Sequence, residues 1–158
     1  GIYGFAQGRG HALIPSDYLS GGLSAYRREV FEAVPFDTAN QLFMTEDIDF
    51  STRAARRFGA RFFLNPNARL AHYMSPFNRD AVGARQRRKA REFCVFYKKR
   101  RQGLADAFAF TWLLCGLAIE AGFAAIRHRR PAALGGFFAG VTDGLRWRLR
   151  EIGGSKNP

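Results

Sequence analysis

The composition of the chain changes abruptly at Leu104, and this change limits the architectures that the chain can adopt. From Leu104 to Ile126 nearly every residue is apolar, with Asp106 and Glu120 as acidic interruptions. The apolar core of this segment, 107–119, is shorter than the roughly 20 residues that a comfortable membrane span needs. A second apolar, glycine-rich segment follows over 132–141. We therefore expect a tail of apolar helices over 102–158.

Arginine clusters border both apolar segments, and Trp147 lies within the one that follows the second segment. The arginines are Arg127, Arg129 and Arg130 between the segments and Arg146, Arg148 and Arg150 after the second. Apolar segments with such borders are typical of interfacial or re-entrant membrane helices. The alternative is a hairpin of buried helices packed on the domain. We expect the tail to contact an anionic membrane surface, at the cytoplasmic side of the cell membrane.

The net charge also points to a polyanionic partner. The chain has 25 Lys and Arg against 13 Asp and Glu, a formal net charge of +12. Nine of the seventeen residues from Arg85 to Arg101 are basic. Nucleic acid, an anionic membrane and phosphate-bearing substrates are the candidates. A helix over 84–101 would place Phe93, Phe96 and Tyr97 on a core-like face away from these cations, which disfavours nucleic acid.

The first hundred residues alternate between helix and strand patterns, which predicts an α/β domain over 1–101. Pro35 ends a first helix, and Gly59 stands where a left-handed C-cap closes a second. Expected helices are 27–34, 46–58 and 84–101, and expected strands are 12–14, 23–26, 61–64 and 68–73. The two cysteines, Cys94 and Cys115, have apolar neighbours, which predicts reduced, packed thiols.

Three carboxylates fall within four positions at the start of the second helix: Glu46, Asp47 and Asp49. Thr45 is positioned to act as N-cap, and the helix dipole favours negative charge in the first turn. One interpretation is therefore a well-capped helix. The other is that the carboxylates carry chemistry.

Several short motifs occur in a fixed order between Leu19 and Pro76. In order they are Ser20, Gly21 and Gly22, then Tyr26 to Phe31, Phe36 and Asp37, then Thr45 to Asp49, then Pro66 and His72. This order resembles the C-terminal half of the family 2 glycosyltransferases, which have the GT-A fold. The apolar tail is similar, more loosely, to the membrane-proximal ends of bacterial members.

The resemblance implies an inverting sugar transfer from a nucleotide-diphospho-sugar to a hydroxyl of a saccharide or lipid-linked acceptor. The N-terminal half of such enzymes binds the donor through an Asp-x-Asp motif and a divalent metal, Mn²⁺ or Mg²⁺. The C-terminal half receives the acceptor. By this match Asp47 is the general base, which must reach the acceptor hydroxyl, and Glu46 tunes or orients it. Asp49 is left with a structural or capping role.

Further residues follow from the same resemblance, each with a plainer alternative. Gly21 and Gly22 would bring the backbone close to a sugar, or form only a tight turn. His72 would complete the metal site, or be structural. Arg79, Arg87 and Arg88 would meet the diphosphate or a lipid phosphate, or form a solvated face.

Two departures from the family pattern matter. The run from Gln86 to Arg91 lacks the Trp of the Gln-x-x-Arg-Trp motif, which disfavours a polymerising synthase. No Asp-x-Asp followed by a strand precedes Gly21, so we expect a piece of a longer protein that is inactive alone. The alternative function is a basic module, anchored to membrane or bound to nucleic acid, without catalysis.

Overall fold

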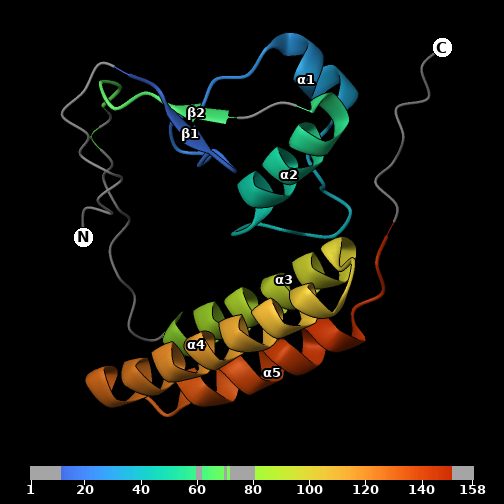
Figure 1. Cartoon of the computed structure of the whole chain (residues 1–158). Coiled ribbons are helices and arrows are strands. Elements are labelled where there is room, and N and C mark those ends of the chain that lie inside the picture. Colours follow the sequence, from blue (N-terminus) through green and yellow to red (C-terminus); the bar gives the residue numbers. More distant parts are fainter. Residues whose placement is uncertain (1–11, 60–61, 70, 72–80, 151–158) are drawn as a thin grey trace. The chain divides into compact units, whose positions relative to one another are not determined.

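Five helices and two short strands make up the part of the chain that the computed structural model describes, residues 12–59, 62–69, 71 and 81–150 (Figure 1). They are β1 (Ile14–Ser16), α1 (Arg28–Ala33), α2 (Glu46–Phe58), β2 (Phe62–Leu64), α3 (Val82–Arg100), α4 (Leu104–His128) and α5 (Ala132–Arg146). The chain divides into two compact units. The mixed unit holds β1, α1, α2 and β2, and the helical unit holds residues 38–45 with α3, α4 and α5. The protein is thus mixed α/β and mostly helical, and the α/β class agrees with the sequence prediction.

The mixed unit is built around the ring of Phe50, which is fully buried on α2. Phe36 stacks on it with ring centroids 4.5 Å apart, and Phe31 stacks at 5.2 Å. Tyr26 meets it edge-on at 4.9 Å and also contacts Phe62 of β2. Such aromatic contacts add to the free energy of burial. The sheet is a single antiparallel pair, β1 with β2.

Helix α2 spans Glu46–Phe58, so the helix predicted over 46–58 is confirmed. Acidic residues occupy its first turn, and Arg56 and Arg57 its last, which complements the helix dipole at both ends. Gly59 has φ +59°, the left-handed conformation that closes a helix. The expected Thr45 cap is wrong: its buried Oγ1 has no hydrogen-bond partner among the described residues.

Two expected strands are absent from the described residues. Residues 23–26 are irregular, because the chain just before them bonds to side chains of α2 rather than to a neighbouring strand. Of the segment 68–73, residues 68, 69 and 71 lie in no strand, and the others lie outside the described residues. The strand predicted at 12–14 corresponds to β1 but lies two residues later, and the strand predicted at 61–64 corresponds to β2, which starts one residue later and ends at the same residue.

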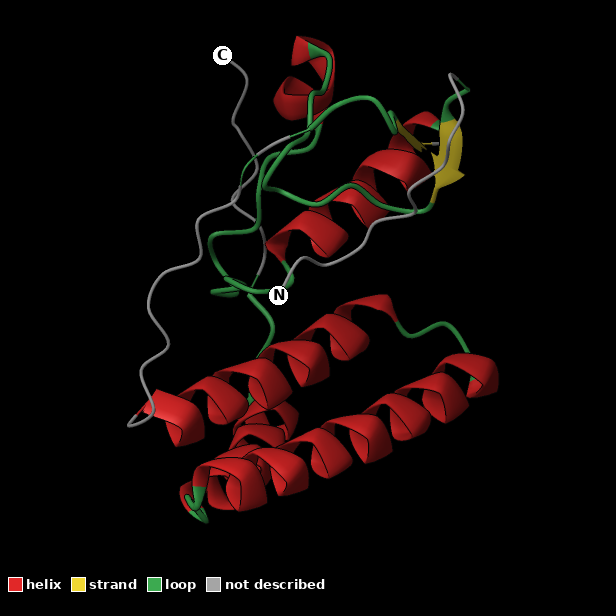
Figure 2. Ribbon diagram, turned by 90° about the vertical axis from the view of Figure 1, so that its left-hand side faces the viewer, coloured by secondary structure: helices red, strands yellow, loops and turns green. Residues whose placement is uncertain are grey.

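The helical unit is a bundle in which α3, α4 and α5 run successively antiparallel (Figures 1 and 2). Its closest contact lies between α3 and α5. Gly136, Gly140 and Gly144 of α5 recur every four residues, and a Cβ at any of them would overlap α3. At Gly140 the overlap would be with the carbonyl oxygen of Arg87. The two backbones can therefore touch only because this ridge carries no side chains.

Helix α4 packs on this pair through one of its faces. Leu117 and Ala121 form a buried cluster with Ala90 of α3 and Phe137 of α5. Near the other end of α4, Phe110 stacks on Tyr97 with centroids 4.1 Å apart. Helix α3 thus belongs to the helical unit, whereas the sequence places it at the end of the portion 1–101.

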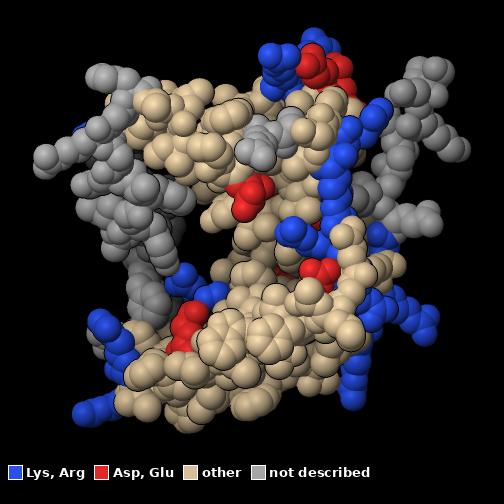
Figure 3. Space-filling view, viewed as in Figure 1, with Lys and Arg blue, Asp and Glu red and all other residues tan. Residues whose placement is uncertain are grey.

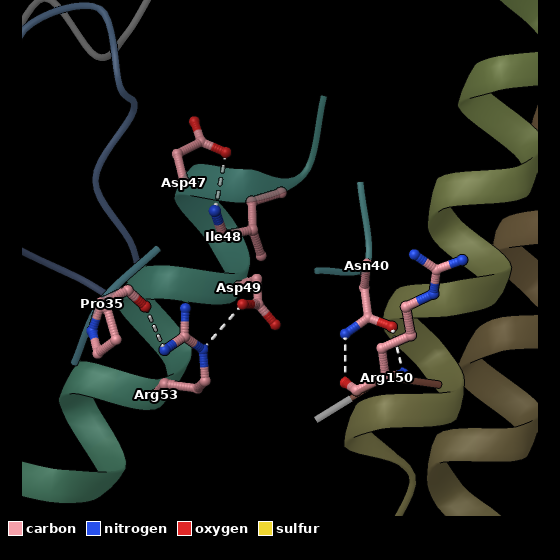
Figure 4. Close-up of polar contacts among 7 residues, drawn as sticks. All are labelled: Pro35, Asn40, Asp47, Ile48, Asp49, Arg53 and Arg150. Carbon is pink, nitrogen blue, oxygen red and sulfur yellow. Dashed lines mark hydrogen bonds and ion pairs between the residues drawn. The ribbon is translucent and has the colours of Figure 1, made fainter. Parts of the chain in front are cut away.

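A buried carboxylate ties the irregular segment 38–45 to the helices. Glu92 of α3 is fully buried, and its Oε2 accepts the backbone N–H groups of Phe43 at 2.9 Å and Met44 at 2.6 Å. Asn40 makes a reciprocal pair with the backbone of Arg150, both bonds 2.8 Å long (Figure 4). Because buried N–H groups need partners, these side chains replace the strand or helix that the segment lacks.

Candidate active site

The structure brings two of the predicted site elements together in the mixed unit. The backbone N–H of Gly21 donates to Asp47 Oδ2 over 3.2 Å, although 26 residues separate them in the chain. The other oxygen of Asp47 accepts the N–H of Ile48 at 2.8 Å, in the first turn of α2 (Figure 4). The predicted base and the predicted glycine turn are therefore neighbours.

This contact follows from how the chain before α1 runs along α2. The N–H of Leu19 donates to Ser51 Oγ at 3.2 Å, one helical turn after Asp47. The hydroxyl oxygen of Tyr26 lies 3.3 Å from Ser51 Oγ, and the ring of Tyr26 contacts Phe50. With Leu19 held at one turn of α2, Gly21 reaches the preceding turn, where Asp47 is.

The glycine turn next to Asp47 is open at Gly22, and Asp47 keeps acceptor positions without a bond from the described residues. A Cβ built on Gly22 would meet no atom within 4 Å, and one on Gly21 would meet only Asp47 Cβ, at 3.8 Å. Asp47 itself is half-buried. A carboxylate offers about four acceptor positions, and the bonds from Gly21 and Ile48 occupy two of those of Asp47. An oriented, accessible carboxylate of this kind can accept the proton of a hydroxyl.

The neighbouring carboxylates differ in their contacts. Glu46 is half-buried in the same first turn and, as the adjacent residue, points about 100° around the helix from Asp47. Asp49 is buried and accepts Arg53 Nε at 2.8 Å, and Arg53 also donates to the carbonyl of Pro35 at 2.7 Å (Figure 4). Asp49 therefore orients Arg53, which links α2 to Pro35, two residues beyond α1, and this agrees with the structural role expected for Asp49.

Of the residues predicted to contact a metal or a phosphate, only some belong to the part of the chain that the structure describes. His72 and Arg79 lie outside the described residues. Within residues 12–59, 62–69, 71 and 81–150, no group of three or more His, Cys, Asp or Glu side chains is arranged to hold a metal ion. The side chains described thus do not fit the divalent metal that the resemblance implies.

Arg87 and Arg88 lie on α3, in the helical unit. Both are exposed, and Arg87 Nε pairs with Asp143 of α5 at 2.6 Å. The hydrogen bond from Arg87 lowers the pKa of Asp143 and raises that of Arg87 itself. An anionic ligand would compete with Asp143 for this guanidinium.

The helical unit adds a feature with membrane character. Of the described helices, α4 is long and apolar enough to cross a bilayer, and little of it is buried. Figure 3 shows that the face over α4 is largely free of charged residues, while Lys and Arg gather toward its two ends. The sequence analysis expected an apolar core of 107–119, too short for a comfortable span; this expectation is wrong for the helix, because α4 spans Leu104–His128, 25 residues. Nor did the sequence show which face of the helix is exposed.

Sequence reasoning missed Glu92 and the glycine ridge of α5. Glu92 stands alone among basic residues, and nothing in its neighbours along the chain marks it as buried. The four-residue spacing of Gly136, Gly140 and Gly144 was a usable signal, since small residues at this spacing let helices approach closely. No family model, no curated protein and no solved structure matches this chain.

Proposed function

We propose that this chain is the acceptor side of an inverting glycosyltransferase. The enzyme would move a sugar from a nucleotide-diphospho-sugar to a hydroxyl of a saccharide or lipid-linked acceptor. The observation that carries the proposal is the bond between the Gly21 N–H and the Asp47 carboxylate. It joins the two motifs that the resemblance assigns to contact with a donor or acceptor sugar and to proton removal.

In this proposal Asp47 works as a general base. One of its remaining acceptor positions takes the hydrogen bond of the acceptor hydroxyl. As the hydroxyl oxygen attacks the anomeric carbon, its proton passes to Asp47 and the bond from carbon to the diphosphate oxygen breaks. The nucleoside diphosphate leaves with the electron pair. The Gly21 and Ile48 N–H groups hold the carboxylate in one orientation, which lowers the entropic cost of the step.

Donor binding belongs, in this proposal, to residues outside the described part of the chain. A divalent metal would sit with them, and His72 remains a candidate ligand.

We propose further that the enzyme works at the cytoplasmic face of the cell membrane. The exposed apolar face of α4 and the net charge of +12 support contact with an anionic membrane surface. A lipid-linked acceptor would be available there. The same features favour, as a second candidate, a membrane-anchoring module without catalysis.

The test of catalysis is sugar transfer by the chain joined to the protein sequence encoded upstream of Gly1. Nucleoside diphosphate release from a panel of UDP-, GDP- and dTDP-sugars would identify a donor. With that donor, Asp47→Asn should lower kcat by about 10² to 10⁴, the usual contribution of a general base. Asp17→Asn, an exposed carboxylate of the same unit, is the matched control and should turn over like the parent.

Transfer by Asp47→Asn at the parent rate would remove Asp47 as the base. Absence of transfer from every donor, by a folded protein that does bind membranes, would instead favour the anchoring module.

A further inference from the structure

Helix α4 is apolar on two faces, and only one of them is packed. Leu117 and Ala121, on the packed face, are buried against α3 and α5. On the other face the side chains are open: Phe108 is 74% exposed, Trp112 75% and Ile126 77%. A helix that is apolar all round is normally covered on both sides.

The exposed residues form one continuous stripe. They recur every three, four or seven positions from one end of α4 to the other, and we call them the α4 stripe. Its members are Leu104, Phe108, Trp112, Cys115, Ile119, Phe123 and Ile126. At 100° per residue they fall within a sector about 100° wide, the width of the apolar face of an amphipathic helix.

Basic residues border the stripe at both ends. Arg100 and Arg101 lie just before α4, and Arg127 and Arg129 lie at its C-terminal end. All four side chains are exposed. A shallow apolar groove, lined by Ile126, Arg129 and Leu134 among others, extends the stripe around the turn into α5. An apolar strip with cations at each end is complementary to an anionic leaflet, whose phosphates lie beside its acyl chains.

The rest of the helical unit decides how α4 can meet the leaflet. Helix α3 is rich in Arg and Lys, and it is joined to α5 through the glycine ridge. It is also joined to α4, since Lys89 pairs with Glu120 at 2.5 Å. Were α4 to span the bilayer inside this bundle, α3 would be drawn into hydrocarbon, where each Arg or Lys is strongly unfavourable. An orientation parallel to the surface leaves α3 in water or among headgroups.

We propose that α4 lies in the plane of an anionic phospholipid leaflet, with the α4 stripe at the boundary between headgroups and acyl chains. This proposal rests on the membrane location proposed above and adds its geometry. Trp112 then sits at the depth that indole rings prefer. The arginines at both ends of the helix contact phosphates of the same leaflet.

The test measures the depth of α4 on vesicles. The packed thiol that the sequence predicts is correct for Cys94, which is buried and whose pKa burial raises to about 11, and wrong for Cys115, which is exposed near the middle of the stripe. A thiol-reactive fluorophore therefore labels Cys115 selectively. In a Cys115→Ala background, Leu104→Cys and Ile126→Cys place the label near each end. Lipids with quenchers at known depths, in vesicles of phosphatidylcholine and phosphatidylglycerol, then report the depth of each position.

An in-plane helix gives similar, shallow depths for all three labels, and the two end positions react equally with a membrane-impermeant thiol reagent added outside. A deep centre, with end positions on opposite sides of the bilayer, would show a spanning helix and overturn the proposal. Failure of the chain to bind these vesicles would overturn both the geometry and the membrane location. Neither result bears on Asp47, whose assay follows sugar transfer.

Matched variants show whether the stripe makes the contact. The double variant Phe108→Gln and Phe123→Gln should weaken vesicle binding at least tenfold, because two apolar rings are no longer buried in the membrane. Phe63→Gln, an exposed phenylalanine of β2, should leave binding unchanged. Equal binding by the stripe variant and its parent would overturn the proposal. So would a dimer in solution that the stripe variant dissociates, because a second copy of the chain would then cover the stripe.

A second pair of variants tests the charge. Arg127→Gln with Arg129→Gln should lower binding to anionic vesicles about tenfold. Arg56→Gln with Arg57→Gln removes the same charge from the end of α2 and should have a much smaller effect. Equal losses for the two pairs would mean that net charge alone drives binding, which contradicts a specific role for the ends of α4.

Discussion

Phe50 and Phe123 show how differently the two units treat their apolar side chains. Phe50 is fully buried on α2, and three aromatic rings surround it. Phe123 is 69% exposed on α4, in line with other large apolar residues. The mixed unit thus gathers its rings around one buried phenylalanine, while Phe31, Phe36 and Phe63 keep 41–51% of their surface exposed. The helical unit has a core, but it also presents a second apolar surface, which is suited to contact with lipid.

The carboxylates show a second contrast between the units. In the mixed unit, Asp47 accepts the N–H of Gly21 at a place with open space beside it. In the helical unit, Glu92 is closed off completely and its contacts are with the chain itself. A carboxylate that is oriented and still accessible can do chemistry, whereas one that is oriented and sealed can only support structure.

The largest effect should come from removing a ring that holds the mixed unit together. Phe50→Ala should lower the free energy of unfolding of that unit by about 3–5 kcal/mol, the cost of a large cavity. Phe123→Ala should change stability by less than about 0.5 kcal/mol in the absence of lipid. Hydrogen exchange of the amides in α2 reports the mixed unit. Fluorescence of the two tryptophans, Trp112 and Trp147, reports the helical unit during denaturation.

If Phe123→Ala destabilised the helical unit as strongly as Phe50→Ala does the mixed one, the α4 stripe would be covered in solution. The contrast between the two units would then be wrong.

A smaller effect is expected at the glycines of the helical unit. Gly140→Ala should destabilise that unit by about 1–3 kcal/mol, because the added methyl group overlaps the backbone of α3 and pushes the helices apart. Gly116→Ala on α4 meets no atom within 4 Å and should stabilise by about 0.5–1 kcal/mol through helix propensity. Tryptophan fluorescence in urea gives both values. Stabilisation by both substitutions would refute the close contact of α3 and α5.

The smallest effect concerns the exposed pair of Arg87 and Asp143. Since the hydrogen bond from Arg87 lowers the pKa of Asp143 in the folded chain, the pair adds stability above the ordinary pKa of aspartate, about 3.9. That contribution disappears as the pH falls through the lowered pKa. NMR titration of the Asp143 carboxyl should show the pKa rising in Arg87→Gln. A part of the lowering should remain, because Arg91 and Arg146 also act on this carboxylate. An unchanged pKa in the variant would show that the pair does not form in solution.

Much of the local structure could be predicted from the sequence. The limits of α2 follow from its acidic first turn, its basic last turn and Gly59, all of which act within a few residues. The end of α1 before Pro35 and the start of the apolar helix at Leu104 have equally local causes. Such features are readable because backbone sterics and the helix dipole act over short distances.

The errors of the sequence analysis have a common cause. Residues 23–26 show a strand pattern, but no strand lies beside them, and the chain before them bonds to Ser51 and Asp47 instead. Thr45 is a good capping residue by type, yet its buried hydroxyl does not cap α2. In both cases the deciding partners are contributed by tertiary packing.

The candidate site was predicted in part. The motif order singled out Asp47 and Gly21, and the resemblance gave them different roles, the general base and a backbone contact with a sugar. Their contact depends on Leu19 and Tyr26 meeting Ser51, which no spacing along the chain implies.

By itself, the sequence determined which segments are helical, where charge and apolar residues concentrate, and that three carboxylates begin α2. These are consequences of residue type and of neighbours a few positions away. Tertiary structure alone decided which carboxylate stays accessible, which is sealed and which face of α4 is left open. Each of these depends on which groups a side chain meets in space. For Asp47 and Glu92 those groups come from distant parts of the chain. For the α4 stripe, as we propose, they come from the membrane.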